Sequence, residues 1–259
     1  MHPYLRLEHP IRFAHRGSRL LWPENTKLAF QRAIDLGYRY IETDVRLTAD
    51  RVVVVFHDRT LDRTTNSFGK IEEWEWADLE KLDAGFEHGP EQGFPYRGKG
   101  ACIPRLDDVL STWPDVYFNI DLKAPRVEWA AAEVIKQLRR SDTVLVGSFS
   151  DRRLAKFRRI TRGTVATAAG PVEAVRLATA ARRGSTPRSA PVAYQLPFDS
   201  RVIPLDVRLV ETAHAAGAHV HAWTVNEAAD MDRLLDIGVD GITTDRPDTL
   251  DDVLRRRSS

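Results

Sequence analysis

The sequence has little sulfur and no long apolar run. Cys102 is the only cysteine among 259 residues, so the chain cannot form an intramolecular disulfide or a thiolate metal cluster. The longest aliphatic run, Val52–Phe56, is far shorter than the roughly 20 residues that span a bilayer. The first residues lack the apolar core and small-residue cleavage site of a secretion signal. We therefore expect a cytoplasmic protein without stable membrane insertion.

Neither sign of charge is in excess. Lysine and arginine total 38 and aspartate and glutamate total 37, which leaves a formal net charge of +1. A chain with this balance has no global field to attract nucleic acid or an anionic membrane surface. We expect a small-molecule partner and no nucleic acid, with any selectivity for anions supplied by local groups.

Short apolar runs alternate with longer amphipathic segments, which is typical of a parallel sheet with helical crossovers. The expected strands are Arg12–His15, Tyr40–Val45, Val116–Lys123, Thr143–Gly147, Thr164–Ala168, Val192–Leu196, Ala218–Thr224 and Asp240–Thr243. The expected helices are Thr26–Leu36, Val127–Arg140, Asp151–Ile160, Val172–Arg182, Asp206–Ala216, Glu227–Asp236 and Thr249–Arg257. This pattern fits one domain over residues 1–259 with a closed (β/α)8 barrel, and an open doubly wound sheet would have similar periodicity.

One connection in this pattern is too short for a parallel crossover. Only a few residues separate the strand Tyr40–Val45 from the run Val52–Phe56, so these two segments are predicted to form an antiparallel hairpin. A turn centred on residues 49 and 50 would place His57 opposite Glu42. The following segment, residues 60–105, is rich in Gly, Pro, Trp and charge. We interpret it as an insertion after the second barrel strand, over one end of the barrel.

Two pairs of charged residues stand at strand positions of matching parity. Glu42 and Asp44 are two residues apart and project from one face, as do Asp121 and Lys123. Inside a barrel such charges need partners, and a divalent cation would be one. Three carboxylates without a thiolate favour Mg²⁺ or Ca²⁺ over zinc. The alternative is that Glu42 and Asp44 only pair with arginines at a strand end.

Two histidines stand where short apolar runs meet loops. Imidazole titrates near neutral pH, so His15 and His57 could act together as general base and general acid on a phosphate or acyl bond. Arg16 and Lys123 would add fixed positive charge for an anion. Further along the chain, His219 and His221 share strand parity with Trp223 and are expected inside the barrel.

Several ordered motifs resemble the glycerophosphodiester phosphodiesterase family. They are AHRG, PENT and AF at residues 14–30, IETDV at 41–45, HDRTLDRTT at 57–65, IPRLDDVL at 103–110, AWTVN at 222–226 and GITTDRP at 241–247. The resemblance covers residues 13–247, apart from the loop 184–190. It implies a TIM barrel with an inserted segment and a divalent-metal-dependent enzyme that hydrolyses glycerophosphodiesters to glycerol 3-phosphate and an alcohol.

The resemblance also implies roles for single residues. Glu42, Asp44 and Asp121 match the metal ligands, and His15 and His57 match the acid/base pair. Arg16 and Lys123 match the residues that contact phosphate, and Trp223 matches a tryptophan that packs against glycerol. Within the PENT motif, Glu24 and Asn25 are interpreted as structural support, with Asn25 a candidate helix cap.

Asp121 departs from the family pattern, which usually has Glu at the third ligand position. Asp is shorter by one methylene, about 1.3 Å of reach. Two alternative functions stay open at this point. One is hydrolysis of a lysophospholipid at the same site, which an apolar acyl groove near the insertion would favour. The other is binding of a phosphate ligand without turnover.

Overall fold

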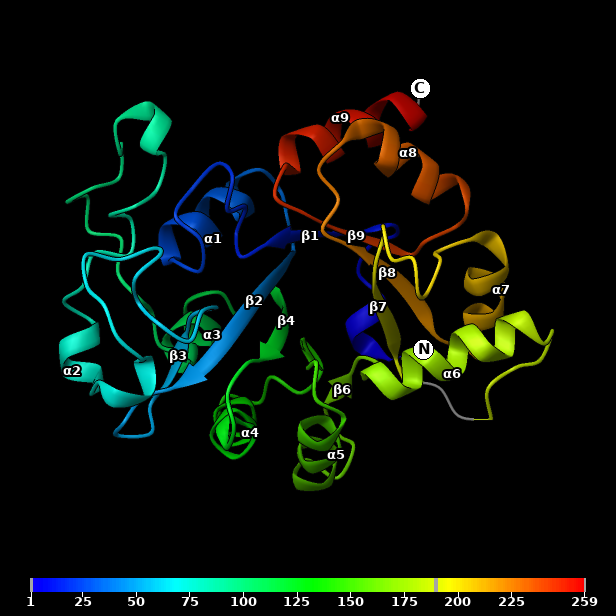
Figure 1. Ribbon diagram of the computed structural model, residues 1–259, viewed down its shortest axis with the longest axis horizontal. Helices are drawn as coiled ribbons and strands as arrows, with labels where there is room; N and C mark the ends of the chain where they lie inside the picture. Colours follow the sequence, from blue (N-terminus) through cyan, green and yellow to red (C-terminus); the bar gives the residue numbers. More distant parts are fainter. Residues whose placement is uncertain (1, 189–190, 259) are drawn as a thin grey trace.

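The computed structural model of the protein describes residues 2–188 and 191–258. Within these residues one sheet is built from β1 (Ile11–His15), β2 (Tyr40–Leu47), β3 (Val53–Val55), β4 (Tyr117–Leu122), β5 (Val144–Gly147), β6 (Ala166–Thr167), β7 (Ala193–Pro197), β8 (His219–Trp223) and β9 (Gly241–Thr244). Each predicted strand is present, with ends that differ by a few residues at most. Figure 1 shows the strands inside a ring of helices.

The sheet nearly closes on itself. Its strands lie side by side in the order β6-β5-β4-β2-β1-β9-β8-β7, and each adjacent pair in this order is parallel. A parallel bridge between Ala168 and Ala193 joins the two ends of the path. The predicted (β/α)8 barrel is therefore confirmed, and the open doubly wound sheet is excluded.

The helices lie outside the strands, as predicted. They are α1 (Lys27–Asp35), α2 (Trp76–Leu79), α3 (Leu106–Thr112), α4 (Val127–Gln137), α5 (Asp151–Ile160), α6 (Pro171–Arg182), α7 (Val207–Ala215), α8 (Ala228–Asp236) and α9 (Pro247–Ser258). The sequence analysis did not identify α2 and α3, which are short. Apolar faces of the helices pack on the outer face of the sheet in two large clusters of buried residues. In the described residues, no helix is long and apolar enough to cross a membrane.

The β2–β3 hairpin forms as predicted, but its register differs from the prediction by one residue. Val45 pairs with Val55 and Leu47 with Val53, so the turn is centred on Asp50. The cause is Arg51, which adopts φ 67° and adds a residue to the turn, closed by the Thr48 amide donating to the Val52 carbonyl at 3.1 Å. The predicted pairing of His57 with Glu42 is therefore wrong.

The segment between β3 and α3 forms the inserted structure that follows the second barrel strand. It contains α2 and two 3-10 helices, Ile71–Glu73 and Pro90–Gln92. A separate apolar cluster holds it against the hairpin; the buried members are Val54, Phe56, Leu61, Ile71, Leu79, Ala84 and Ile103. Figure 1 shows this segment at one side of the barrel, next to α1 and β3.

Aromatic side chains fill the end of the barrel opposite the strand carboxyl ends. The N-terminal 3-10 helix Pro3–Leu5 places the Tyr4 ring at 5.3 Å from the ring of Tyr40. The Tyr40 hydroxyl donates a hydrogen bond to the Tyr4 carbonyl at 2.6 Å. His221 lies above this layer, fully buried against Phe13 at a ring separation of 5.0 Å. Neither ring nitrogen of His221 has a hydrogen-bond partner among the described residues. The interior position predicted for His221 is confirmed.

The burial of His221 predicts a pH dependence of folding. Burial lowers the pKa of His221 to about 3, from an ordinary value of 6.5, so the unfolded chain binds a proton that the folded chain does not. The stability that neutral His221 contributes is present above its pKa in the unfolded chain, and it is lost as the pH falls toward its pKa in the folded chain. We expect this group to cost about 2 kcal/mol of stability between about pH 7 and about pH 5. Chemical denaturation at both pH values should show a smaller loss in His221→Leu; an equal loss would contradict this assignment.

Candidate functional site

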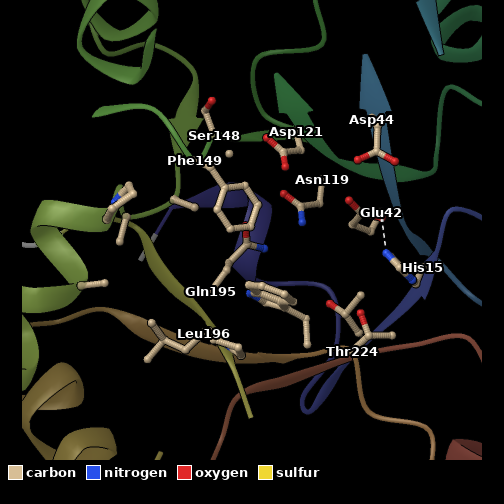
Figure 2. Close-up of a pocket in the computed structure, with 18 of the residues that line it drawn as sticks. His15, Glu42, Asp44, Asn119, Asp121, Ser148, Phe149, Gln195, Leu196 and Thr224 are labelled. Carbon is tan, nitrogen blue, oxygen red and sulfur yellow. Dashed lines mark ion pairs between the residues drawn. The ribbon is translucent and has the colours of Figure 1, made fainter. Parts of the chain in front are cut away.

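Neighbouring strands bring the predicted carboxylates together at the mouth of the barrel. β2 and β4 pair in parallel with Glu42 beside Asn119 and Asp44 beside Asp121. These residues line a cavity of about 520 Å³ at the carboxyl ends of the strands. Figure 2 shows their side chains grouped on one wall of this cavity. The parity predicted from the sequence therefore holds for both strands.

Two cations neutralise part of this negative charge. The Lys123 Nζ lies 2.6 Å from Asp121 Oδ2 and 3.1 Å from Asp44 Oδ1, while Arg16 Nε lies 3.1 Å from Asp44 Oδ2. Although burial alone would raise it, these cations hold the pKa of Asp44 at about 2. Burial, with the adjacent Asp44 charge, raises the pKa of Glu42 well above its usual range. Arg16 and Lys123 therefore keep Asp44 ionised, whereas they do not offset the burial of Glu42 and the charge beside it.

The carboxylates offer the oxygen ligands that a hard divalent cation prefers. The buried Oδ1 atoms of Asn119 and Asp121 have no hydrogen-bond donor among the described residues, while Asp44 Oδ1 has an ion pair with Lys123 Nζ at 3.1 Å. Oxygen donors of this kind suit Mg²⁺ or Ca²⁺. In the described part of the chain, no three or more His, Cys, Asp and Glu side chains are already arranged to hold a metal. Lys123 instead occupies the space between Asp44 and Asp121.

His15 ends β1 and carries a carboxylate partner that the sequence analysis did not single out. Its Nδ1 lies 2.7 Å from Asp245 Oδ1, and its Nε2 lies 3.7 Å from Glu42 Oε2, the dashed contact in Figure 2. Asp245 is fully buried, and its other oxygen accepts from Arg19 Nε at 2.9 Å. Hydrogen bonds from His15 and Arg19 outweigh burial and lower the pKa of Asp245. An ionised Asp245 fixes the imidazole with Nε2 toward the cavity.

His57 also pairs through Nδ1 with a carboxylate. It follows the hairpin, lines the cavity, and has its Nδ1 2.5 Å from Asp58 Oδ1. Arg46 Nε donates to the His57 carbonyl at 2.8 Å and so holds the backbone at this point. The hydrogen bond with His57 is the main reason that the pKa of Asp58 lies well below its usual range. The structure therefore brings both predicted histidines to one cavity.

A tight turn after β1 presents Arg16 to the same cavity. Arg16, Gly17 and Ser18 have φ values of 53°, 77° and 80°, and a Cβ on Gly17 would lie 2.8 Å from the Ala29 backbone. Arg16 is buried and its Nη1 donates to Glu24 Oε1 at 2.9 Å. Arg16 therefore lies beside Asp44 at the cavity, and its contact with phosphate stays a prediction.

The PENT motif supports the site from behind. Asn25 Nδ2 donates to Asp44 Oδ2 at 2.9 Å, and its Oδ1 accepts from Thr43 at 2.7 Å. The predicted helix-capping role of Asn25 is wrong, because Thr26 is the N-cap residue of α1 and accepts from the Ala29 amide. Asn25, with φ 57°, therefore serves to orient a carboxylate of the site.

The opposite wall of the cavity is apolar. Trp223 ends β8 and meets the ring of Phe149 at 5.6 Å, edge to face, and Lys123 Nζ lies 5.2 Å from the same Phe149 ring. The remaining apolar members come from α6, from the end of β7 and from the loop after it; they are Pro171, Ala174, Val175, Leu196, Pro197 and Ile203. One cavity thus joins a charged wall to an apolar wall (Figure 2).

A parallel barrel with charged groups around a cavity at its carboxyl end has the arrangement of a TIM-barrel enzyme. Comparison with known proteins identifies the family: the model of the glycerophosphoryl diester phosphodiesterase family matches residues 15–249. The chain belongs to this family of phosphodiesterases, as the motifs predicted, and the prediction of an enzyme is confirmed.

Similar proteins cover nearly the whole chain. The chain is 38% identical to a probable glycerophosphodiester phosphodiesterase 2 of Mycobacterium tuberculosis, over 98% of this chain and 94% of that protein. It is 35% identical to a glycerophosphodiester phosphodiesterase of Caldanaerobacter subterraneus, over 94% and 97%. Among solved structures, an Oleispira antarctica phosphodiesterase in complex with the product sn-glycerol-3-phosphate has a TM-score of 0.79 at 27% identity, over 95% and 97% of the two chains.

The crowding at Gly17 predicts a large effect of a single methyl group. Gly17→Ala would place a Cβ against the α1 backbone while keeping a left-handed φ, so we expect a loss of about 3 kcal/mol in unfolding free energy. Gly37→Ala is the matched control, because Gly37 has φ 90° with nothing within 4 Å of the added Cβ, and should cost about 1 kcal/mol. Equal losses in urea denaturation would show that the turn is not packed in this way.

Proposed function

We propose that the protein is a divalent-metal-dependent hydrolase of glycerophosphodiesters that releases glycerol 3-phosphate and an alcohol by acid/base catalysis at His15 and His57. The observation that carries the proposal is the pair of imidazoles at one cavity, each bound through Nδ1 to its own carboxylate, beside a wall of buried acidic groups. Family membership and the product found in the Oleispira structure support this substrate class.

Glu42, Asp44 and Asp121 would hold the metal, with Mg²⁺ or Ca²⁺ as the ion. When bound, the ion would stabilise negative charge on a phosphate oxygen and lower the pKa of a coordinated hydroxyl. Asp121 is shorter by one methylene than the Glu that the family usually has at this position, and the neighbouring Asn119 offers an oxygen on the same strand face. The glycerol moiety would pack against Trp223 at the end of β8.

The phosphate oxygens would be contacted by Arg16 and Lys123. Both cations already lie against Asp44, so a phosphate must compete with carboxylates for them. The Nε2 atom of one histidine would take a proton from the attacking oxygen, and the other histidine would give a proton to the departing alcohol. The same residues serve whether that oxygen is the glycerol 2-hydroxyl, which yields a cyclic phosphate opened later by water, or water itself.

Removal of metal tests the proposed activity directly. We expect glycerol 3-phosphate to be released from glycerophosphocholine, release to stop with a chelator, and Mg²⁺ or Ca²⁺ to restore it, because unpaired carboxylates would otherwise repel the phosphate. A coupled enzymatic assay of glycerol 3-phosphate measures this. Binding of the substrate without turnover at any metal concentration would instead indicate a phosphate-binding protein, the non-enzymatic alternative.

Replacement of either histidine should remove turnover without unfolding the protein. For His15→Ala and His57→Ala we expect kcat to fall by a factor of about 10²–10⁴, since each loses a proton-transfer group. His214→Ala is the matched control, because His214 lies on α7, where its Nε2 contacts Asp240 at 2.8 Å. Steady-state kinetics measure the loss of turnover, and circular dichroism shows whether each variant is folded. Retained kcat in both site variants would exclude the proposed mechanism.

One observation favours the second candidate function, hydrolysis of a lysophospholipid at the same site. The apolar wall formed by α6, β7 and Phe149 could bind an alkyl chain. This wall is formed by α6 and β7 rather than by the insertion, near which an acyl groove would favour this function. A cavity of about 330 Å³ beside the insertion has charged residues among its lining, including Glu24, Arg63 and Glu87. Lysophosphatidylcholine, supplied in the assay above, tests this function through release of choline.

A further inference from the structure

The inserted segment sends one arginine to the two loops that carry the proposed site. Arg63 Nε donates to Asp58 Oδ2 at 2.6 Å. Its two terminal nitrogens donate to both oxygens of Glu24, at 2.8 and 2.7 Å. The planar guanidinium therefore bridges two carboxylates, a geometry that the single ammonium of a lysine does not reproduce.

Each of these carboxylates holds a different residue of the site. Asp58 uses its other oxygen to bind His57 Nδ1 at 2.5 Å, and Glu24 Oε1 also accepts from Arg16 Nη1 at 2.9 Å. Glu24 is mostly buried, and the hydrogen bonds from Arg63 and Arg16 outweigh burial and lower its pKa. A continuous chain thus runs from His57 through Asp58, Arg63 and Glu24 to Arg16.

The geometry points to Arg63 as a positioning residue that sets the His57 imidazole relative to the phosphate-binding Arg16. The inference rests on the proposed function, because it needs His57 to transfer a proton. Without Arg63, Asp58 loses the partner that holds its carboxylate toward the imidazole, so His57 rotates and its Nδ1–H loses its acceptor. Arg16 is then the remaining partner of Glu24. Glu24 therefore draws the Arg16 guanidinium away from the cavity. The main consequence is a lower kcat, with a smaller rise in KM.

Arg59 provides a matched control within the same segment. It pairs with Glu72 on the surface through Nε and Nη2, and neither residue lines the cavity. Arg59→Ala removes an exposed bridge of the same residue type, which is worth little in solution. Any effect of Arg63→Ala beyond that of Arg59→Ala therefore reports the connection to Asp58 and Glu24.

The experiment is a double-mutant cycle with glycerophosphocholine at saturating Mg²⁺ or Ca²⁺. We expect Arg63→Ala to lower kcat by about 10- to 100-fold with KM raised less than kcat falls. Arg63→Lys should recover only part of this loss, and methylguanidinium should raise the kcat of Arg63→Ala but not that of Arg59→Ala. Because Arg63 acts through Asp58, the kcat of Arg63→Ala/Asp58→Ala should match that of Asp58→Ala alone.

Multiplicative losses in the double variant, or an Arg63→Ala enzyme equal to Arg59→Ala, would overturn the inference. The kcat of His57→Ala in the same assay separates failure of this inference from failure of the proposed function. Full activity of His57→Ala would contradict the proposed function and, with it, the inference about Arg63. Imidazole ¹⁵N spectra give a readout that needs no turnover. Arg63→Ala should lose the hydrogen-bonded Nδ1–H signal of His57, and an unchanged signal would refute the positioning role even in an enzyme without activity.

Discussion

The burial of three carboxylates at the ends of two neighbouring strands is the constraint on which the rest of the site depends. Parallel pairing of β2 and β4 places Asp44 directly beside Asp121, with Glu42 one step deeper. Charges in such a position are costly without partners, and this cost explains why Arg16, Lys123 and Asn25 all converge on Asp44. The left-handed turn at Gly17 exists because Arg16 must reach this point from β1.

His15 and His57 lie on different elements, and each pairs through Nδ1 with an aspartate. His15 is held by a buried aspartate at the end of β9, and His57 by the residue that follows it in the chain. Each carboxylate fixes a tautomer and leaves Nε2 free of it, so under the proposed function the barrel would supply one proton carrier and the hairpin the other. Arg63 links the second carrier to the first loop. The inserted segment is thereby connected to the barrel mouth by charge as well as by its small apolar core.

Much of the fold was predictable because its signals are local. Alternating periodicity identified every barrel strand, and glycines with positive φ end helices where Gly37, Gly217 and Gly238 stand. The hairpin register was not predictable, since it depends on Arg51 adopting a left-handed conformation without a glycine. The eight predicted site residues line one cavity. Asp245 and Arg63 stand in the quoted motifs but were not singled out, because Asp245 contacts His15 from 230 positions away and Arg63 contacts Glu24 from 39 positions away.

The proposed function requires Glu42, Asp44 and Asp121 to bind one divalent cation at the mouth of the barrel. Calorimetric titration of the metal-free protein with Mg²⁺ and Ca²⁺ tests this without reference to turnover. We expect saturable binding of one ion, lost in Asp44→Asn and unchanged in a surface variant such as Asp252→Asn. Absence of binding to the wild-type protein, or equal binding by Asp44→Asn, would contradict it.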